Sequence, residues 1–111
     1  MRSDELLGTH RQELRRGTVV LACLLALREP GYGYGLLKTL EAAGIPSDGN
    51  TVYPLLRRLE ERGLLESKWN TEESRPRKFY RTTKVGSELA AQLLTDVADL
   101  TASLHALNRR S

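Results

Sequence analysis

Positive charge gathers in one short stretch of this 111-residue chain. Between Ser74 and Lys84 there are five basic side chains and no acidic one: Arg75, Arg77, Lys78, Arg81 and Lys84. Arginine and lysine at this density can neutralise the phosphates of a polyanion, and each neutralised phosphate releases counterions. The stretch therefore indicates binding to a nucleic acid, although a solvated basic face is the plainer alternative.

A second group of polar side chains precedes this stretch. Ser47, Asn50, Thr51 and Tyr53 cluster where a helix is expected to begin, and Arg57 follows within the next turns. Backbone N–H groups at a helix start favour phosphate, and Asn, Ser, Thr and Arg side chains there can reach base edges in a major groove. The alternative is that Asn50 and Thr51 only cap the helix. Both groups on one contiguous unit favour DNA binding over that alternative.

The elements that must position these groups follow in the order helix, strand, turn, strand. A helix over 48–63 is expected to end at Gly63 and to feed directly into a strand over 64–70, and the second strand carries the basic run. Pro54 lies inside this helix if Asp48 is the N-cap, and near its first turn if Asn50 is the N-cap. A helix that runs into a hairpin is the order of a winged helix-turn-helix.

Within the hairpin, Trp69 has two interpretations. It could stack on a ligand, or it could pair across the strands with Phe79 or Tyr80 and hold the hairpin together. The cross-strand pair is the prediction, because an aromatic residue at strand spacing more often packs against its neighbour than against a ligand.

Three further helices are expected before this unit. The first spans 4–16 and is amphipathic, and Gly17 is expected to end it. The second spans 19–28 and is apolar nearly all round, which predicts a central position. The third spans 36–43, after a glycine- and tyrosine-rich turn.

The last helix is expected over 84–107, with Thr83 as its cap. Apolar side chains recur along it at alternating steps of four and three, the spacing of a coiled-coil seam. About 24 residues extend roughly 36 Å, more than the small domain can cover, and soluble monomers rarely expose so long an apolar stripe. We therefore predict a homodimer whose interface includes Leu7, Leu89, Leu93, Val97, Leu100, Leu104 and Leu107.

Composition restricts the protein class less than these patterns do. The net charge of +3 and the pI near 9.3 are only mildly basic. Cys23 lies in an apolar run and has no metal-ligand spacing to the two histidines, so an inert buried thiol is expected. The longest apolar run has about nine residues, far short of the ~20 of a membrane span. We expect a soluble, cytoplasmic protein that is not an enzyme, because no catalytic constellation, cofactor motif or metal site is legible.

Five blocks of the chain resemble the PadR-type transcriptional regulators: Leu14–Thr18, Gly31–Tyr34, Asn50–Glu60, Gly63–Glu66 and Arg77–Thr83. The resemblance covers nearly the whole chain, and its single C-terminal helix is similar to that of the short subgroup. Tyr32 stands where members usually have histidine. The resemblance implies a dimeric repressor on a near-palindromic operator, often released by a small molecule. An effector would be sought between the N- and C-terminal helices at the dimer interface.

We therefore expect one domain over 1–111, mostly α-helical with a small β-hairpin. A winged helix-turn-helix would occupy 17–82, and helices in 1–16 and 83–111 would form the dimer interface. The residues expected to contact double-stranded DNA are Ser47, Asn50, Thr51, Tyr53, Pro54, Arg57, Arg75, Arg77 and Lys78. The alternative is a winged-helix module whose basic hairpin binds an acidic protein.

Overall fold

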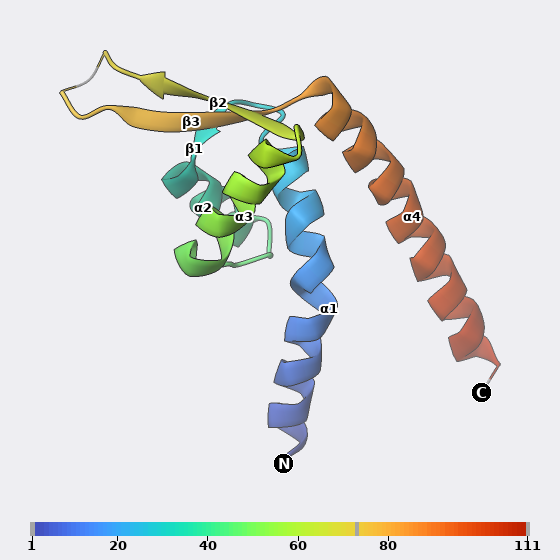
Figure 1. Cartoon of the computed structure of the whole chain (residues 1–111). Coiled ribbons are helices and arrows are strands. Elements are labelled where there is room, and N and C mark those ends of the chain that lie inside the picture. The colour runs from blue at the N-terminus through green and yellow to red at the C-terminus, as the bar shows by residue number, and fades with distance from the viewer. Residues whose placement is uncertain (1, 73, 111) are drawn as a thin grey trace.

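The computed structural model describes residues 2–72 and 74–110; Glu73, in the expected turn of the hairpin, lies outside them. A small sheet lies over a layer of helices (Figure 1). The elements are α1 (Ser3–Ala26), β1 (Gly31–Tyr32), α2 (Gly33–Ala42), α3 (Gly49–Glu61), β2 (Leu65–Asn70), β3 (Arg77–Thr82) and α4 (Lys84–Arg109). The predicted class, mostly helical with a winged helix-turn-helix and a long C-terminal helix, is confirmed.

α1 is one continuous helix, so the expected break at Gly17 is wrong. A glycine inside a helix costs about 1 kcal/mol relative to alanine, whereas two new helix ends would leave backbone N–H and C=O groups to be satisfied elsewhere. Buried side chains occur only from Val19 onward, and every residue from Arg2 to Thr18 is exposed. The N-terminal leg (residues 3–18) therefore projects from the domain as a rigid extension of its central helix (Figure 1).

The sheet has three antiparallel strands in the order β1-β3-β2, one more than the expected hairpin. In the added strand, Gly31 lies opposite Tyr80 and Tyr32 lies opposite Phe79. Two residues are too few to show a period of two, so this strand had no signal in the sequence. It ties the start of α2 to the wing (β2, β3 and the residues between them).

Trp69 does not pair with Phe79 or Tyr80, so that prediction is wrong. The register places Trp69 opposite Lys78, and the tryptophan is 63% exposed. Phe79 instead meets the edge of the Tyr32 ring, with the ring centroids 6.0 Å apart. The unpredicted strand β1 supplies that aromatic partner, which is why the pairing within the hairpin was misjudged.

The passage from α3 into the wing depends on one glycine. Gly63 has φ +76°, a left-handed conformation that favours glycine. Its N–H donates to the carbonyl of Glu60 (3.0 Å), and the N–H of Leu64 donates to the carbonyl of Leu59 (2.9 Å). This pair of bonds is the Schellman motif, which ends the helix and directs the chain into β2.

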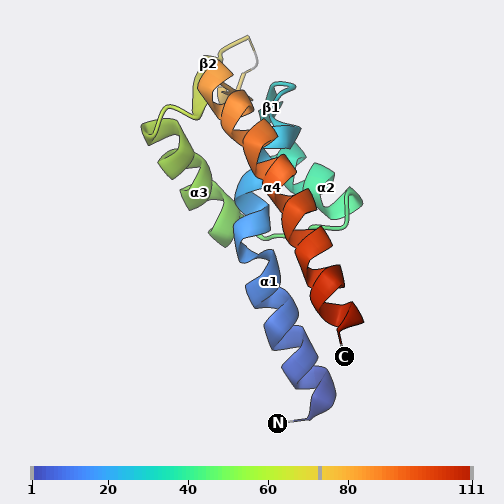
Figure 2. The ribbon, with the colours of Figure 1, turned by 90° about the vertical axis from the view of Figure 1, so that its right-hand side faces the viewer.

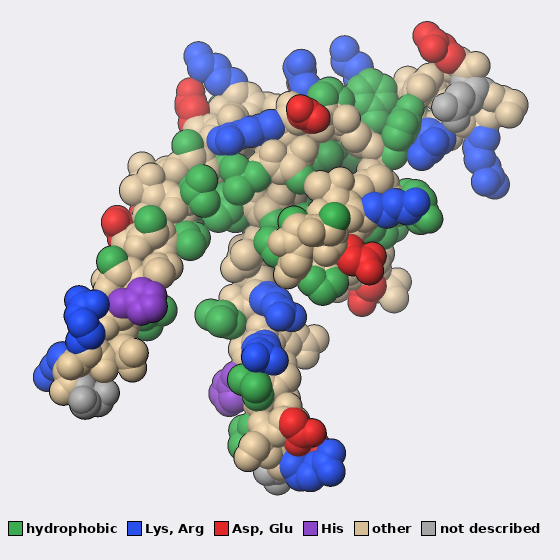
Figure 3. Space-filling view, turned by 180° about the vertical axis from the view of Figure 1, so that it is seen from behind, with side chains coloured by type: hydrophobic (Ala, Val, Ile, Leu, Met, Phe, Trp, Pro, Cys, Tyr) green, Lys and Arg blue, Asp and Glu red, His purple; other side chains and the backbone are tan. Residues whose placement is uncertain are grey.

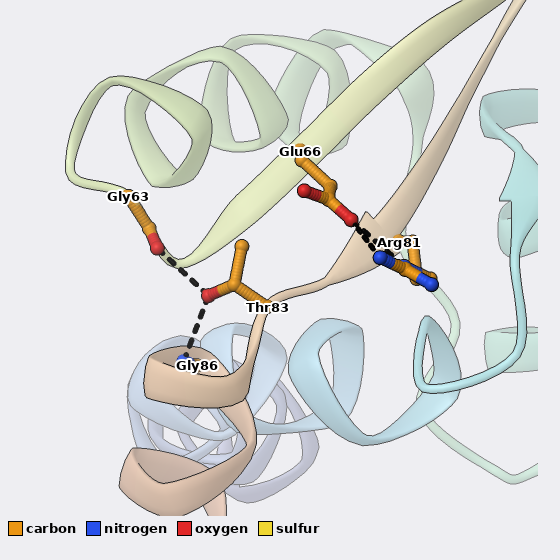
Figure 4. A network of polar contacts seen from close by, with 5 residues as sticks. All are labelled: Gly63, Glu66, Arg81, Thr83 and Gly86. Carbon is orange, nitrogen blue, oxygen red and sulfur yellow. Dashed lines mark hydrogen bonds and ion pairs between the residues drawn. The ribbon is translucent and has the colours of Figure 1, made fainter.

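Thr83 begins α4 and fastens it to the same turn (Figure 4). Its hydroxyl donates to the carbonyl of Gly63 (2.7 Å) and accepts from the N–H of Gly86 (3.0 Å), so the predicted cap is confirmed. A Cβ at Gly86 would collide with the carbonyl oxygen of Leu64 and lie 2.9 Å from Cγ2 of Thr82. The close approach that glycine permits sets the direction in which α4 leaves the domain.

The core lies where α1, α2, α3 and the inner face of the sheet meet. Figures 1 and 2 show α2 and α3 below the sheet on either side of the upper part of α1, with α4 descending on a different side. The hydroxyl of Thr82 donates to the carbonyl of Leu24 (2.7 Å), which joins the end of β3 to α1. Side chains that are at most 2% exposed are Cys23, Leu24, Leu27, Leu40, Val52, Leu56, Leu59, Leu65 and Ala90.

Candidate nucleic-acid interface

The N-terminal end of α3 is set by Asp48, which decides between the two caps that the sequence left open. Its carboxylate accepts from the N–H of Thr51 at 2.9 Å. Pro54 consequently lies inside the helix, where its missing N–H leaves the carbonyl of Asn50 without its usual partner. Asn50 and Thr51 remain exposed, so the side chains at this end are available to a partner.

One face of α3 combines amide and guanidinium groups. Asn50 and Arg57 are seven residues apart, which is close to two helical turns, and half-buried Pro54 lies between them. Arg57 is exposed and makes no ion pair with any other residue in 2–72 or 74–110. Amide and guanidinium groups on one exposed helix face can form bidentate hydrogen bonds with adenine and guanine edges. Ser47 is half-buried just before the cap.

Tyr53 serves the structure more than it serves the surface. Its ring lies against Gly33, where an added Cβ would overlap Cε1 of the ring, and against Gly49, where a Cβ would lie 2.8 Å from Cε2. The ring thus joins the start of α2 to the start of α3, while 41% of the residue stays exposed. Its glycine partners explain why the glycine-rich turn at 31–35 is needed without a phosphate-binding loop.

The basic residues of the wing differ in what surrounds them. Arg75 is exposed and without an ion pair among the described residues. Arg77 is half-buried, with its guanidinium carbon 4.0 Å from the centroid of the Tyr32 ring. The hydroxyl of that ring in turn accepts from the amide of Asn70 at 2.7 Å. Arg77 is therefore held against the sheet, whereas Arg75 can extend from it.

Lys78 is engaged by an acid that lies outside the basic stretch. Its Nζ is 3.3 Å from Oε1 of Glu60 on α3, and the hydroxyl of Ser67 donates to the other oxygen of that carboxylate. The pKa of Glu60 is lowered by the Ser67 hydrogen bond; partial desolvation opposes this change, and the hydrogen bond and charge of Lys78 add to it. The triad fastens the C-terminal part of α3 to both strands of the wing.

Arg81 is also paired, with Glu66 across the sheet (Figure 4). Glu60 and Glu66 thus offset two of the five cations in the stretch that contains no acid of its own. This pairing was not anticipated, although the expected strand register could have brought Glu66 opposite Arg81. Side chains paired in this way present less charge to a polyanion than their number suggests.

The residues predicted to form a dimer interface lie away from the wing. Leu100 and Leu104 of α4 are 63% and 62% exposed, and Leu7 of the N-terminal leg is 50% exposed. Leu93 is half-buried at the upper end of the same apolar stripe (the exposed and half-buried apolar residues of α4). The rest of the predicted set is also exposed: Leu89, Val97 and Leu107. Figure 3 shows hydrophobic side chains along both projecting helices.

Other chemistry finds little support in these side chains. Across residues 2–72 and 74–110, no three His, Cys, Asp or Glu residues gather as metal ligands. Cys23 is fully buried, and burial raises its thiol pKa to about 11. No helix of the described chain has both the length and the apolar character to cross a membrane.

Comparisons with known proteins agree with this geometry. The family model described as the PadR-like family of transcriptional regulators matches residues 20–92. A solved PadR family regulator from Eggerthella lenta DSM 2243 is 45% identical, covers 94% of this chain and 93% of its own, and superposes with a TM-score of 0.89. A transcriptional regulator from Clostridium thermocellum is 26% identical over 85% of this chain and 96% of its own, with a TM-score of 0.76.

A transcriptional regulator from Streptococcus is likewise 26% identical, over 86% of this chain and 96% of its own, also with a TM-score of 0.76. No curated protein matches the chain significantly. The matched region includes the central part of α1, α2, α3, the wing and the start of α4. The chain therefore belongs to the PadR-like family and is a DNA-binding transcriptional regulator.

Proposed function

We propose that this protein is a sequence-specific repressor that binds a near-palindromic operator as a homodimer in the cytoplasm and is released by a small molecule. The observation that carries the proposal is the division of the surface. The exposed polar end of α3 and the wing lie on one side of α1, and the exposed apolar stripe of α4 lies on another (Figure 1). One side suits a polyanion and the other suits a second copy.

The predicted DNA-contacting residues take different roles in this proposal. Asn50 and Arg57 reach base edges, because both project from the exposed face of α3. Arg75 and Arg77 contact phosphates from the wing. Lys78 contributes a weaker phosphate contact, because Glu60 holds it. Side chains that surround the start of α3 support these contacts or bind the backbone: Ser47, Thr51, Tyr53 and Pro54.

The proposed dimer rests on the length and exposure of α4. Its 26 residues extend about 39 Å at 1.5 Å per residue, and the lower part meets no other element of the same chain. Burying a leucine side chain stabilises an association by about 1.5–3 kcal/mol before its costs are counted. A second copy would cover the stripe and the apolar side of the N-terminal leg. Twofold symmetry would then present two recognition helices to two half-sites.

A small-molecule effector would bind between the N-terminal leg and α4, at the proposed dimer interface. Both helices present apolar side chains there, and Figure 3 shows the two diverging below the domain. A ligand in that space would alter the spacing of the two recognition helices, because α4 is fastened to the α3–β2 turn through Thr83. Such a change of spacing would lower operator affinity.

Selection of duplexes from a randomised pool by the purified protein tests the proposal. We expect an enriched, near-palindromic sequence, and protection of the same sequence upstream of genes in the source genome. Arg75→Ala should weaken binding to all duplexes alike and lower the salt slope by about one, whereas Asn50→Ala should cost about 1–3 kcal/mol at one operator position. A pool that shows no enrichment at moderate salt would contradict sequence-specific binding. The basic wing would then fit an acidic protein partner better.

A further inference from the structure

An open groove lies between α1 and the N-terminal end of α3, on a part of the surface that no predicted role uses as a whole. Its volume is about 670 Å³. Val19 of α1, Pro46 of the preceding loop and Leu55 of α3 supply its apolar part. Its polar part includes three arginines, which makes it the second basic surface of the molecule after the wing.

The charges around this groove favour an anion. Arg15 and Arg58 line it from opposite helices, are exposed, and make no ion pair with any residue in the described ranges. Arg16 also lines the groove and pairs with Glu13 at 3.1 Å. The acidic residue in the lining is Asp48, whose carboxylate already accepts the N–H of Thr51. Two unpaired guanidinium groups therefore outweigh one engaged carboxylate.

The groove borders the face of α3 that is proposed to read bases. Thr51 and Arg58 line it, and each follows by one residue a member of that face, Asn50 or Arg57. One residue turns a helix by about 100°, so a duplex that contacts the reading face passes beside the groove. The wing is fastened near the other end of α3 through Glu60. The reading face thus lies between two basic surfaces, one at each end of the helix.

We infer that this groove binds the DNA backbone on the side of each half-site that faces the operator centre, with Arg15 and Arg58 contacting phosphates. The inference rests on the proposed function. It follows from the path of α1, since Gly8 and Arg15 line the groove on the N-terminal leg, whose other side carries Leu7. If that other side meets the partner, the groove faces the interval between the two half-sites, and the wing contacts the outer flank.

The test uses the full chain and a duplex that it selects from a randomised pool. Arg15→Ala and Arg58→Ala should each weaken binding by about two- to fivefold and lower the slope of log affinity against log salt by about one. The double variant should lower that slope by about two. Arg11→Ala is the matched control, because Arg11 is an exposed arginine on the same leg that does not line the groove. Lysine at position 15 or 58 should preserve the slope, since it keeps the charge.

Phosphate ethylation interference then locates the contacts. In the wild type, ethylation between the half-sites should block binding; in the double variant this block should disappear, while the block on the outer flanks remains. Loss of interference on the outer flanks instead, or a double variant with the affinity and salt slope of Arg11→Ala, would overturn the inference while leaving the proposed function intact. Failure of the wild type to select any duplex would refute both. Circular dichroism checks that each variant is folded.

Discussion

Replacing Glu60 with alanine removes the carboxylate that joins α3 to both strands of the wing. The side chain loses the hydrogen bond from Ser67 and the ion pair with Lys78, and it is about one-third exposed. A hydrogen bond to a charged group contributes about 1.5–3 kcal/mol when buried, and an exposed ion pair contributes about 0.2–1 kcal/mol. Discounted for exposure, the two together should stabilise the fold by about 1–2 kcal/mol.

Urea unfolding followed by circular dichroism, at pH 7 and one fixed protein concentration, measures this loss. Glu61→Ala is the matched control, because Glu61 is the exposed neighbour in the same helix and the gain in helix propensity is the same. The difference in unfolding free energy between the two variants isolates the contacts of Glu60. Glu60→Ala should unfold at a lower urea concentration with an unchanged m-value.

The pH dependence gives a second, independent readout. Because the folded state lowers the pKa of Glu60, its contribution is fully present above the ordinary glutamate pKa and is lost as the pH falls through the lowered value. The stability gap between the wild type and Glu60→Ala should therefore close in acid. Equal stability of the Glu60→Ala and Glu61→Ala variants at pH 7, or a gap that persists in strong acid, would refute the role assigned to this carboxylate.

Three further predictions concern the core and the proposed interface. Leu104→Asp should yield monomers with little operator affinity in sedimentation experiments, whereas Ser103→Asp on the polar side of α4 should remain dimeric. Gly33→Ala should lower the unfolding free energy by about 1–3 kcal/mol, since its Cβ would overlap an aromatic ring, while Gly35→Ala, with nothing within 4 Å, should not destabilise. Cys23, with a pKa of about 11, should resist a thiol reagent at pH 8 until urea unfolds the chain.

Much of the architecture could be predicted because the signals are local. Gly63 ends α3 with a left-handed conformation, and Thr83 caps α4 with its own hydroxyl three residues from the N–H that it accepts. Periodicity likewise indicated the wing strands and the stripe of α4. Where the local signal was weak, the prediction was wrong: a single glycine at position 17 was taken as a helix end, and the two-residue strand Gly31–Tyr32 passed unnoticed.

The candidate DNA-contacting residues were chosen by type and spacing, and their contacts remain predictions. The structure adds what surrounds each of them. Tyr53 proves to be held against two glycines, Arg77 lies over Tyr32, and Arg57 and Arg75 extend from the surface. The groove beside Arg58 had no signal in the sequence, because its two walls come from helices that only the fold brings together.

The sequence by itself determined the order of the elements, the ends of α3 and α4, and the presence of a basic stretch, because each depends on neighbours within a few residues. Only the tertiary structure decided how much of that charge remains available. Glu66 and Arg81 are 15 residues apart in the chain, and the strand register places them face to face. A carboxylate offsets the cation that lies nearest to it in space, and that distance is set by the packing of helix against sheet.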